Sequence, residues 1–351
     1  MSLKSTTNYY SLLISHYSLP ITQLIPLPAY RPPWYLPNGH LQTIVPALTR
    51  KVRNVAYRRE ELATPDGDRL QLDRLTHPAR RLVVISHGLE GDSNRPYVRG
   101  MSRAFYREGY DVLAWNFRGC GDTPNHTLRF YHSGATDDLH HVLTHGIEPA
   151  DYDQIVLVGF SLGGNLTLKY LGEQMYPVPS TVRAALAFSA PIDLQSCARQ
   201  MARPQNRVYH HRFLRALKRK VTRKHQQFPE ELSLVTLAGV KSLTDFDDAF
   251  TAPLHGFRSA ADYYRRCSSK QFLTAIEVPT RVVNARNDPI LGPECFINDD
   301  RLSGTPVEFV APEQGGHCGF LRRGHRAGEN YWSEQVAVEF ARQHLAPVPT
   351  D

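Results

Sequence analysis

The sequence predicts an α/β protein with a mainly parallel β-sheet. Short apolar runs recur along the chain, and segments of helical length and spacing lie between them. Each run carries apolar residues on both faces of the expected strand, as a sheet covered by helices on both sides requires. Because strands alternate with helices, βαβ units are expected. The predicted strands are 82–86, 112–115, 155–158, 184–188, 280–285 and 307–310.

A β-hairpin is expected ahead of these strands. Residues 52–63 and 69–75 flank the turn sequence PDGD, which is typical of an antiparallel connection. Downstream, five segments have the length and apolar spacing of helices that would cover the sheet. These predicted helices are 97–108, 136–145, 162–174, 262–274 and 333–344.

One long interval interrupts the alternation of strands and helices. About ninety residues separate the strand ending near 188 from the one beginning near 280, and they include Pro204, Pro229 and several helix-compatible runs. We therefore expect an inserted helical cap over the carboxyl edge of the sheet. The predicted organisation is an N-terminal arm packed on the core (1–50), a core formed by 51–193 and 275–351, and a mostly helical cap (194–274).

Composition places the chain among ordinary globular proteins. Its 351 residues are 41% hydrophobic and 21% charged, which excludes disordered, fibrous and small disulfide-stapled classes. The five cysteines are scattered and include no CxxC pair, so neither a disulfide framework nor a zinc site is expected. The apolar stretch at 10–30 is interrupted by prolines, unlike a signal peptide or a membrane span. We expect a cytoplasmic protein in a reducing compartment, without metal or cofactor.

Positive charge is concentrated in one segment. Lys plus Arg number 41 and Asp plus Glu 34, a net charge of +7, yet 199–224 alone holds ten Lys or Arg and no acid. Within it, Leu214, Leu217 and Val221 are spaced as one apolar stripe of a helix. Such a helix either contacts an anionic membrane or attracts acidic substrates, or it is a solvated cap helix whose stripe packs on the domain below. Nucleic-acid binding is not expected, because no supporting motif accompanies the charge.

A candidate nucleophile lies where a predicted strand meets a predicted helix. The sequence GFSLG follows IVLV and opens the helix beginning at Leu162, the context in which G-x-S-x-G forms a nucleophile elbow. Such a turn is sharp, so Gly159 and Gly163 supply the small residues that let backbone and helix approach each other. The turn lifts the Ser161 hydroxyl above the sheet. An incidental serine in a glycine-rich turn is the plainer alternative.

An acid and a histidine follow the last two predicted strands. A serine hydroxyl needs a base to take its proton, and Asp288 and His317 lie where the topology brings them to the same sheet edge. The chain order Ser, Asp, His is that of one hydrolase arrangement, with His317 as general base and then general acid and Asp288 fixing its tautomer. A turn former before Pro289 and a surface loop histidine are the plain alternatives. Asp193 is a rival acid, with helix capping as its structural interpretation.

Two main-chain amides are predicted to form an oxyanion hole. The Leu162 amide begins a helix, where it is free to donate and the helix dipole favours negative charge. The loop HGLEG at 87–91 follows an early strand, and its glycines let the Leu89 amide face Ser161 from the opposite side. A tight turn without a catalytic role is the other interpretation of these glycines.

These motifs together resemble the α/β-hydrolase superfamily. Within it, PNGHLQTI at 37–44, HGLEG at 87–91 and GFSLGGN at 159–165 are similar to the YheT-like branch of bacterial hydrolases and their mammalian lipid-hydrolase relatives. The matches run from about 33 to 340, and NGHLQT is the part specific to this branch. The resemblance implies hydrolysis of carboxylic esters, with short-chain acyl esters and monoacylglycerols as the usual suggestions, and no cofactor. The mammalian relatives carry an N-terminal membrane anchor that this sequence does not show.

We therefore expect a serine carboxylic-ester hydrolase that acts through an acyl-enzyme on short- to medium-chain acyl esters or monoacylglycerol-like lipids. Its expected partners are a small-molecule or lipid ester and, through the basic cap segment, the surface of an anionic membrane. Two alternatives stay open. One is an acyltransferase that uses the same triad, and the other is a non-catalytic binding protein that keeps the fold.

Two further groups have both a functional and a structural interpretation. The NGHLQT element at 38–43 either supplies hydrogen bonds near the site, through His40 or Gln42, or only fastens the arm to the sheet. A trio of histidines shares one predicted helix face but lacks the HExxH pattern, so a zinc site is not expected. The trio consists of His140, His141 and His145.

Overall fold

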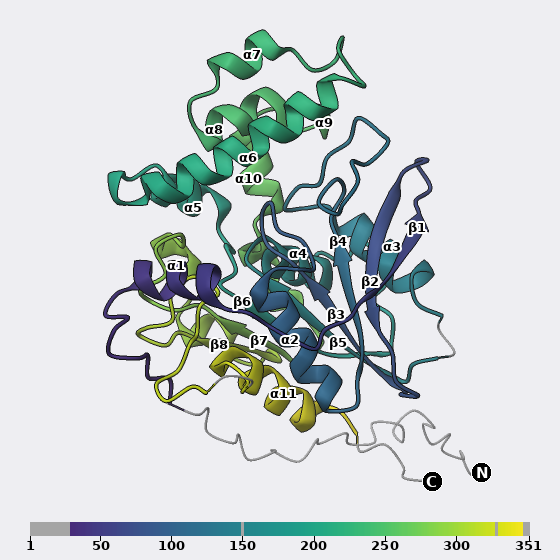
Figure 1. The fold of residues 1–351 in the computed structure, drawn as a ribbon, viewed down its shortest axis with the longest axis vertical. Helices are drawn as coiled ribbons and strands as arrows, with labels where there is room; N and C mark the ends of the chain where they lie inside the picture. Colours follow the sequence, from purple (N-terminus) through teal and green to yellow (C-terminus); the bar gives the residue numbers. More distant parts are fainter. Residues whose placement is uncertain (1–28, 149–150, 327–328, 347–351) are drawn as a thin grey trace, which may run out of the picture.

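The computed structural model describes residues 29–148, 151–326 and 329–346, and Figure 1 shows a β-sheet with helices on both sides. Residues 1–28 of the predicted N-terminal arm lie outside the described residues. Within the described part, eight strands form one sheet in the order β1-β2-β4-β3-β5-β6-β7-β8. The β1–β2 and β2–β4 pairs are antiparallel, and all other neighbours are parallel. The prediction of a mainly parallel sheet is confirmed.

The strands follow the predicted apolar runs, with shifted ends. The hairpin is confirmed, but residues 52–57 are not part of its first strand. Because Arg58 pairs with Arg74 and β2 ends one residue later, at Leu75, most of this segment has no residue of β2 to pair with. The strand predicted at 280–285 ends at Val283. The bounds are β1 (Arg58–Ala63), β2 (Arg69–Leu75), β3 (Arg81–Ser86), β4 (Asp111–Asn116), β5 (Gln154–Phe160), β6 (Val182–Phe188), β7 (Thr280–Val283) and β8 (Val307–Val310).

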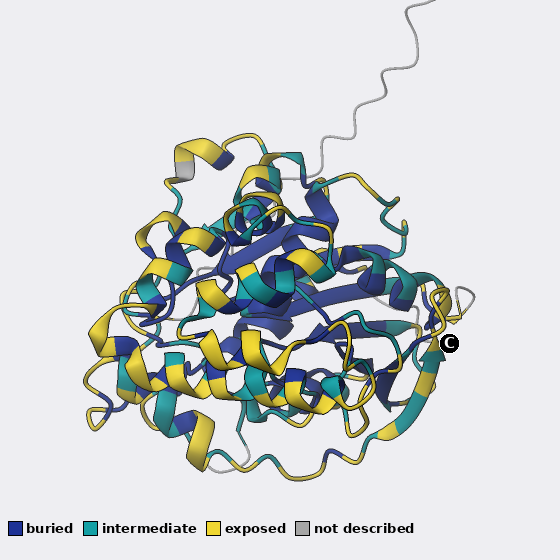
Figure 2. Ribbon diagram, turned by 90° about the horizontal axis from the view of Figure 1, so that it is seen from above, coloured by how far each residue is buried: buried dark blue, intermediate teal, exposed yellow. Residues whose placement is uncertain are grey.

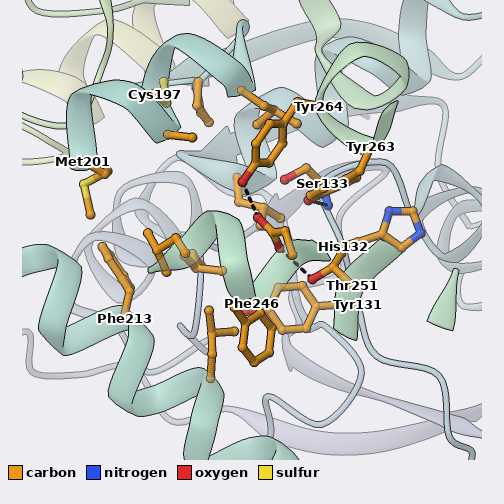
Figure 3. Close-up of a pocket in the computed structure, with 18 of the residues that line it drawn as sticks. Tyr131, His132, Ser133, Cys197, Met201, Phe213, Phe246, Thr251, Tyr263 and Tyr264 are labelled. Atoms are coloured by element: carbon orange, nitrogen blue, oxygen red, sulfur yellow. Dashed lines mark hydrogen bonds between the residues drawn. The ribbon is translucent and has the colours of Figure 1, made fainter. Parts of the chain in front are cut away.

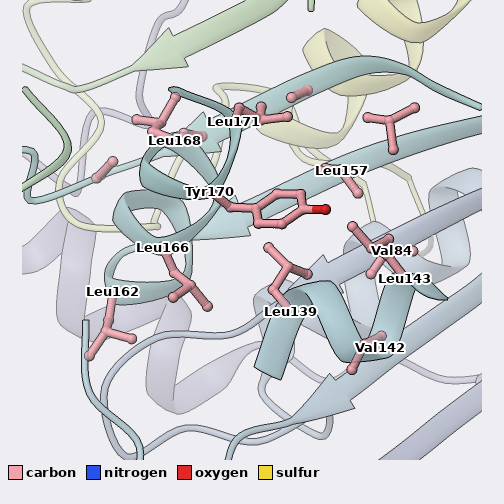
Figure 4. Packing of buried hydrophobic residues seen from close by; sticks show 14 of the residues in the cluster. Val84, Leu139, Val142, Leu143, Leu157, Leu162, Leu166, Leu168, Tyr170 and Leu171 are labelled. Atoms are coloured by element: carbon pink, nitrogen blue, oxygen red, sulfur yellow. The ribbon is translucent and has the colours of Figure 1, made fainter. Parts of the chain in front are cut away.

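Helices cover both faces of the sheet and close the core. Leu139 and Leu166 pack with Val84 on one face (Figure 4), whereas Phe105 and Phe340 pack on the other. The strands between these layers are dark blue in Figure 2, as a fully covered sheet requires. The covering helices are α2 (Pro96–Arg107), α3 (Thr136–His145), α4 (Leu162–Gly172) and α11 (Trp332–His344).

The helices differ from the prediction at two places. The segment 262–274 is not one helix, because Ser268 takes an extended conformation and separates α10 (Ala260–Cys267) from the 3₁₀ helix η3 (Ser269–Ala275). The NGHLQT element, for which no helix is predicted, begins α1 (Gly39–Thr49). The Asn38 side chain caps α1 by accepting a hydrogen bond from the Leu41 amide at 3.0 Å.

The long interval between β6 and β7 is helical. Figure 1 shows its helices standing above the sheet, on the side where the parallel strands end. Its first part comprises α5 (Leu194–Met201), η1 (Pro204–Asn206), α6 (Arg207–His225), α7 (Leu234–Gly239), α8 (Leu243–Phe246), the π-helical η2 (Asp247–Thr251) and α9 (Ala252–Leu254). Two short helices, η4 (Pro293–Cys295) and η5 (Asp299–Leu302), lie between β7 and β8. The division of the chain into arm, core and cap domains stays a prediction, and we use the word cap only for the helices between β6 and β7.

The basic helix α6 uses its apolar stripe for packing. Leu214 and Val221 are buried in a cluster of cap residues, which also includes Phe130 from the core. Two of the lysines on α6 also turn inward: Lys220 forms an ion pair with Glu90, and Lys224 is buried. The apolar stripe is therefore packed, as the structural interpretation expects, whereas contact of the basic residues with a membrane or with acidic substrates stays a prediction.

Candidate active site

The turn between β5 and α4 holds Ser161 in a strained conformation. Its φ of 52° and ψ of −122° lie outside the backbone conformations that residues other than glycine usually adopt. A Cβ on Gly159 would lie 2.4 Å from the Gly163 carbonyl oxygen, and one on Gly163 would lie 2.4 Å from the His87 carbonyl oxygen. The two glycines are therefore required by the tight turn, as the sequence predicts.

The structure brings Ser161, His317 and Asp288 together in one hydrogen-bonded chain. Ser161 Oγ lies 2.9 Å from His317 Nε2, and His317 Nδ1 lies 2.8 Å from Asp288 Oδ2. The Asp288 side chain is fully buried, and its other oxygen accepts the Ile290 amide at 2.9 Å. Because a carboxylate only accepts hydrogen bonds, Nδ1 carries the imidazole proton and Nε2 is left to accept from the serine hydroxyl.

Asp193, the rival acid, has a different role in the structure. Its side chain accepts the Ser196 amide at 3.0 Å and caps α5. Its other oxygen lies 3.7 Å from Lys270 Nζ. These contacts match the helix-capping interpretation, and the histidine's partner is Asp288.

Both predicted oxyanion donors lie beside Ser161. Leu162 is the first residue of α4, where an amide has no partner in the helix, and Leu89 lies in the loop after β3. Within the described residues, the Leu89 amide donates no hydrogen bond. Leu89 and Leu162 both line a cavity together with Ser161 and His317.

His87 fixes the direction of the Leu89 amide. The Phe117 amide donates to His87 Nε2 at 3.1 Å, so Nδ1 carries the proton and donates to the Gly88 carbonyl at 2.8 Å. The Gly91 amide donates to the same carbonyl at 2.9 Å. The Gly88 carbonyl and the Leu89 N–H belong to the same planar trans peptide, in which the N–H points away from the C=O. The two hydrogen bonds to this carbonyl therefore also fix the Leu89 N–H, which points away from the His87 ring. Burial lowers the pKa of His87 to about 3, which keeps this imidazole neutral.

Comparison with known proteins shows the family of the chain. A family model described as alpha/beta hydrolase fold matches residues 81–323. The chain belongs to the α/β hydrolase family. The Escherichia coli (strain K12) protein named "Putative esterase YheT" is 36% identical to this hydrolase over 291 residues, 81% of this chain and 84% of the relative.

Two more distant proteins define how far the likeness extends. "Phospholipase ABHD3" of Mus musculus is 29% identical over 309 residues, which are 84% of the hydrolase and 72% of the relative. The solved structure of the Pyrococcus furiosus esterase Pf2001 superposes with a TM-score of 0.53 at 16% identity and covers 90% of this chain and 97% of that chain. At this identity the likeness to Pf2001 shows the fold.

Helix α1 holds the loops that carry Asp288 and His317. Thr43 Oγ1 accepts the His317 amide at 2.8 Å, and Gln42 Oε1 accepts the Gly315 amide at 2.8 Å and the Asn287 side chain at 3.0 Å. Gln42 and Thr43 are buried. Of the two residues singled out from the sequence, Gln42 supports the site loops. His40 instead lies 3.2 Å from the Tyr209 hydroxyl of the cap, and the role of Thr43 was not predicted.

The cavity above Ser161 in this hydrolase has two lobes. A narrow lobe of about 150 Å³ runs into the cap between mostly apolar side chains (Figure 3), and a wide lobe of about 570 Å³ opens along α6. Ser161, His317 and Leu89 line both lobes, so the reacting centre lies where the two meet. Apolar residues of the narrow lobe include Phe130, Phe213, Leu243, Phe246 and Phe250.

One carboxyl group interrupts the apolar lining of the narrow lobe. Asp247 accepts hydrogen bonds from the Thr251 and Tyr264 hydroxyls, both at 2.6 Å, which are among the dashed lines of Figure 3. Burial raises the pKa of Asp247 to about 6, although these two hydrogen bonds oppose the shift. The sequence offered no pattern that singles this residue out.

The remaining candidates do not form a ligand site. Within the three described ranges, no three His, Cys, Asp or Glu side chains gather as metal ligands. The rings of His141 and His145 stack, and His140 lies 3.1 Å from the Tyr170 hydroxyl. In the same part of the chain, no helix has the length and apolarity needed to cross a lipid bilayer.

Proposed function

We propose that this protein is a carboxylic-ester hydrolase that uses Ser161 as nucleophile. The observation that carries the proposal is the chain of hydrogen bonds from Ser161 Oγ through both nitrogens of His317 to the buried Asp288. Family membership and the names of the relatives support ester hydrolysis as the reaction class. The strained turn that exposes Ser161 supports its role as nucleophile.

In the first half of the proposed reaction, Ser161 Oγ attacks the ester carbonyl carbon while His317 Nε2 takes the hydroxyl proton. The carbonyl oxygen becomes an oxyanion, and the Leu89 and Leu162 amides donate to it. When the tetrahedral intermediate collapses, the bond to the alcohol oxygen breaks and His317 returns the proton to that oxygen. Asp288 stabilises the imidazolium during this step. An acyl-enzyme and a free alcohol result.

In the second half, a water molecule gives its proton to His317 Nε2 and attacks the acyl carbon. Collapse of the second intermediate releases the carboxylic acid, and the proton returns to Ser161 Oγ. The wide lobe beside Ser161 leaves room for this water, which favours hydrolysis over transfer to a second alcohol. No cofactor is needed at any step of this sequence.

The apolar lobe supports an acyl chain as the group on the carbonyl side of the ester. Phe213, Phe246 and Phe250 offer a surface that gains from contact with methylene groups. We therefore infer short- to medium-chain acyl esters or monoacylglycerol-like lipids as substrates. Contact of residues 199–224 with an anionic membrane stays a prediction, which co-sedimentation with vesicles of varied anionic-lipid content tests.

Hydrolysis of p-nitrophenyl esters from acetate to palmitate, by the wild type and by Ser161→Ala, tests the proposal. We expect release of p-nitrophenol by the wild type, a chain-length optimum set by the narrow lobe, and loss of activity by a factor of about 10⁴ or more in the variant. A fluorophosphonate should label the wild type and leave the variant unlabelled. Folded wild-type protein that neither hydrolyses an ester nor takes the label would refute the proposal.

A further inference from the structure

One face of α6 presents a row of arginines to the wide lobe. Arg212, Arg219 and Arg223 line this lobe, together with Ala216 between them. Residues seven and eleven positions after Arg212 return to the same side of an α-helix, so the three guanidinium groups form a stripe. We call these three residues the arginine stripe. All three are exposed to solvent.

The acidic groups of the wide lobe do not neutralise this stripe. Seven basic and three acidic side chains line the lobe. Glu90 is engaged by Lys220 at 2.7 Å, and Asp122 pairs with an arginine of β1. Asp92 accepts a main-chain amide at 2.8 Å. The lobe therefore keeps a surplus of positive charge after its internal pairs are formed.

The other cations of the lobe have acceptors of their own. Arg50 pairs with a buried glutamate of α11, Arg95 donates to the Glu90 carbonyl at 2.6 Å, and Lys224 donates to the Asn125 carbonyl at 2.8 Å. By contrast, no carboxylate of the described residues lies within ion-pair distance of the arginine stripe. The stripe is thus the part of the lobe that is left to meet a ligand.

The position of Ser161 relates this charge to the reaction. The narrow lobe is apolar and the wide lobe is basic, and Ser161 lies on the wall of both. An ester whose carbonyl sits at Ser161 can place its acyl chain in the narrow lobe only if its alcohol part lies in the wide lobe. We propose that the preferred substrate is an acyl ester whose alcohol part bears an anionic group, a phosphate or a carboxylate, which the arginine stripe binds.

This inference rests on the proposed ester hydrolysis and adds a substrate class to it. Guanidinium groups bind phosphate and carboxylate through paired N–H donors, and such charge-assisted bonds are stronger than neutral ones. Binding an anion also relieves the mutual repulsion of three neighbouring positive charges. Because the stripe is exposed, added salt should weaken the effect.

The experiment compares kcat/KM for three esters with the same acyl chain, used as monomers: a 1-acylglycerol, its 3-phosphate, and the matching glycerate ester. The wild type should prefer the phosphate and carboxylate esters over the neutral one, by about tenfold to a hundredfold for the phosphate, and the preference should shrink as salt rises. The relative size of the two preferences identifies which anion the stripe is built for.

The decisive variant replaces Arg212, Arg219 and Arg223 with Gln together. It should lose most of the preference for the anionic esters, measured as the ratio of kcat/KM values, so a general loss of folded protein does not change the readout. The matched control replaces Arg207, Arg215 and Lys218 with Gln. These three residues lie on the same helix but do not line the wide lobe, and replacing them removes the same amount of positive charge. The control should keep the wild-type ratio.

Three results would overturn the inference. They are equal kcat/KM for anionic and neutral esters, equal loss of preference in the stripe and control variants, or a stripe variant that keeps the preference while losing only its binding to anionic vesicles. The last result would assign the stripe to a membrane surface instead of a substrate. In each case, hydrolysis of p-nitrophenyl esters that depends on Ser161 would leave the proposed function standing. Absence of that hydrolysis would remove both.

Discussion

The two walls of the site are built differently. The core wall consists of loops that follow β3, β5, β7 and β8, and buried side chains hold these loops through hydrogen bonds, as the Thr43 hydroxyl does by accepting the His317 amide. The cap wall consists of side chains from helices between β6 and β7, and it supplies most of the apolar lining and the arginine stripe. From this difference we expect the core wall to set the chemistry and the cap wall to set the substrate. Changes in the core wall should therefore reduce kcat, whereas changes in the cap wall should alter stability, pH response or selectivity.

After the loss of the Ser161 hydroxyl itself, the largest effect is expected on the core wall, in Asp288→Asn. An amide at this position can donate to Nδ1, which favours the imidazole tautomer that protonates Nε2 and leaves the serine without a base. We expect kcat for a p-nitrophenyl ester to fall by roughly 10³–10⁴ with little change in KM. Asp193→Asn is the matched control, since it alters a helix cap and should leave kcat unchanged. Equal activity of the two variants would mean that Asp288 is not the catalytic acid.

The next effect tests the contact between the walls. Lys220 of α6 lies 2.7 Å from Glu90, next to the predicted oxyanion donor Leu89, and 3.1 Å from Cys120 Sγ. Although burial lowers it, the neighbouring Cys120 and Glu90 raise the pKa of Lys220 overall. Lys220→Met leaves the largely buried Glu90 carboxylate without its cation. Because both side chains are slightly exposed, we expect a smaller loss than for a fully buried pair, about 2–3 kcal/mol in the free energy of unfolding.

Denaturant unfolding measures this loss, and a second substitution separates charge from packing. Adding Glu90→Gln to Lys220→Met removes the unpaired charge while keeping an acceptor for the Tyr131 hydroxyl, which bonds Glu90 Oε1 at 2.7 Å. The double variant should therefore recover most of the lost stability. If the effects of the two substitutions on the free energy of unfolding simply added, the ion pair would not couple the cap to this loop.

A smaller effect is expected for Thr43→Val in α1. The substitution keeps the shape of the side chain but leaves the His317 amide without its acceptor, so the loop that carries the imidazole can shift. We expect kcat and the rate of fluorophosphonate labelling to fall by about tenfold, with KM unchanged. Thr49→Val is the matched control, because Thr49 bonds only within α1. Loss of thermal stability with unchanged kcat would show that Thr43 is structural and does not position His317.

These contacts show what the sequence could and could not predict. Ser161 and the sheet edge were predictable, because each catalytic candidate follows an apolar run and parallel strands end on one side. The support from Thr43 was not predictable, since its hydrogen bond joins residues 274 positions apart. Nor does a basic helix pattern tell which cations turn inward, as Lys220 does, and which face a cavity. That choice depends on how α6 packs on Phe130 and its neighbours, which local sequence does not determine.

The smallest effect concerns Asp247 in the cap wall and its response to pH. Its pKa of about 6 exceeds the ordinary 3.8, so between these values the folded protein keeps a proton that the unfolded chain has lost. The stabilisation is thus present at low pH and is lost as pH rises through about 6. Because Asp247 is only half-buried and lines the narrow lobe, we expect the free energy of unfolding of the wild type to fall by about 1 kcal/mol relative to Asp247→Asn from pH 4 to 7.

Asp245→Asn sharpens this last test, because Asp245 belongs to the same cap but has the opposite shift. The Lys241 amide and Ser242 lower its pKa, so its contribution is lost only as pH falls below the ordinary range of a carboxyl group. Its difference from the wild type should therefore stay flat between pH 5 and 7, where that of Asp247→Asn changes. If the free energies of unfolding of the two variants depended on pH in the same way, Asp247 would not be protonated in the narrow lobe. Its carboxyl group would then be an anion at neutral and mildly acidic pH alike.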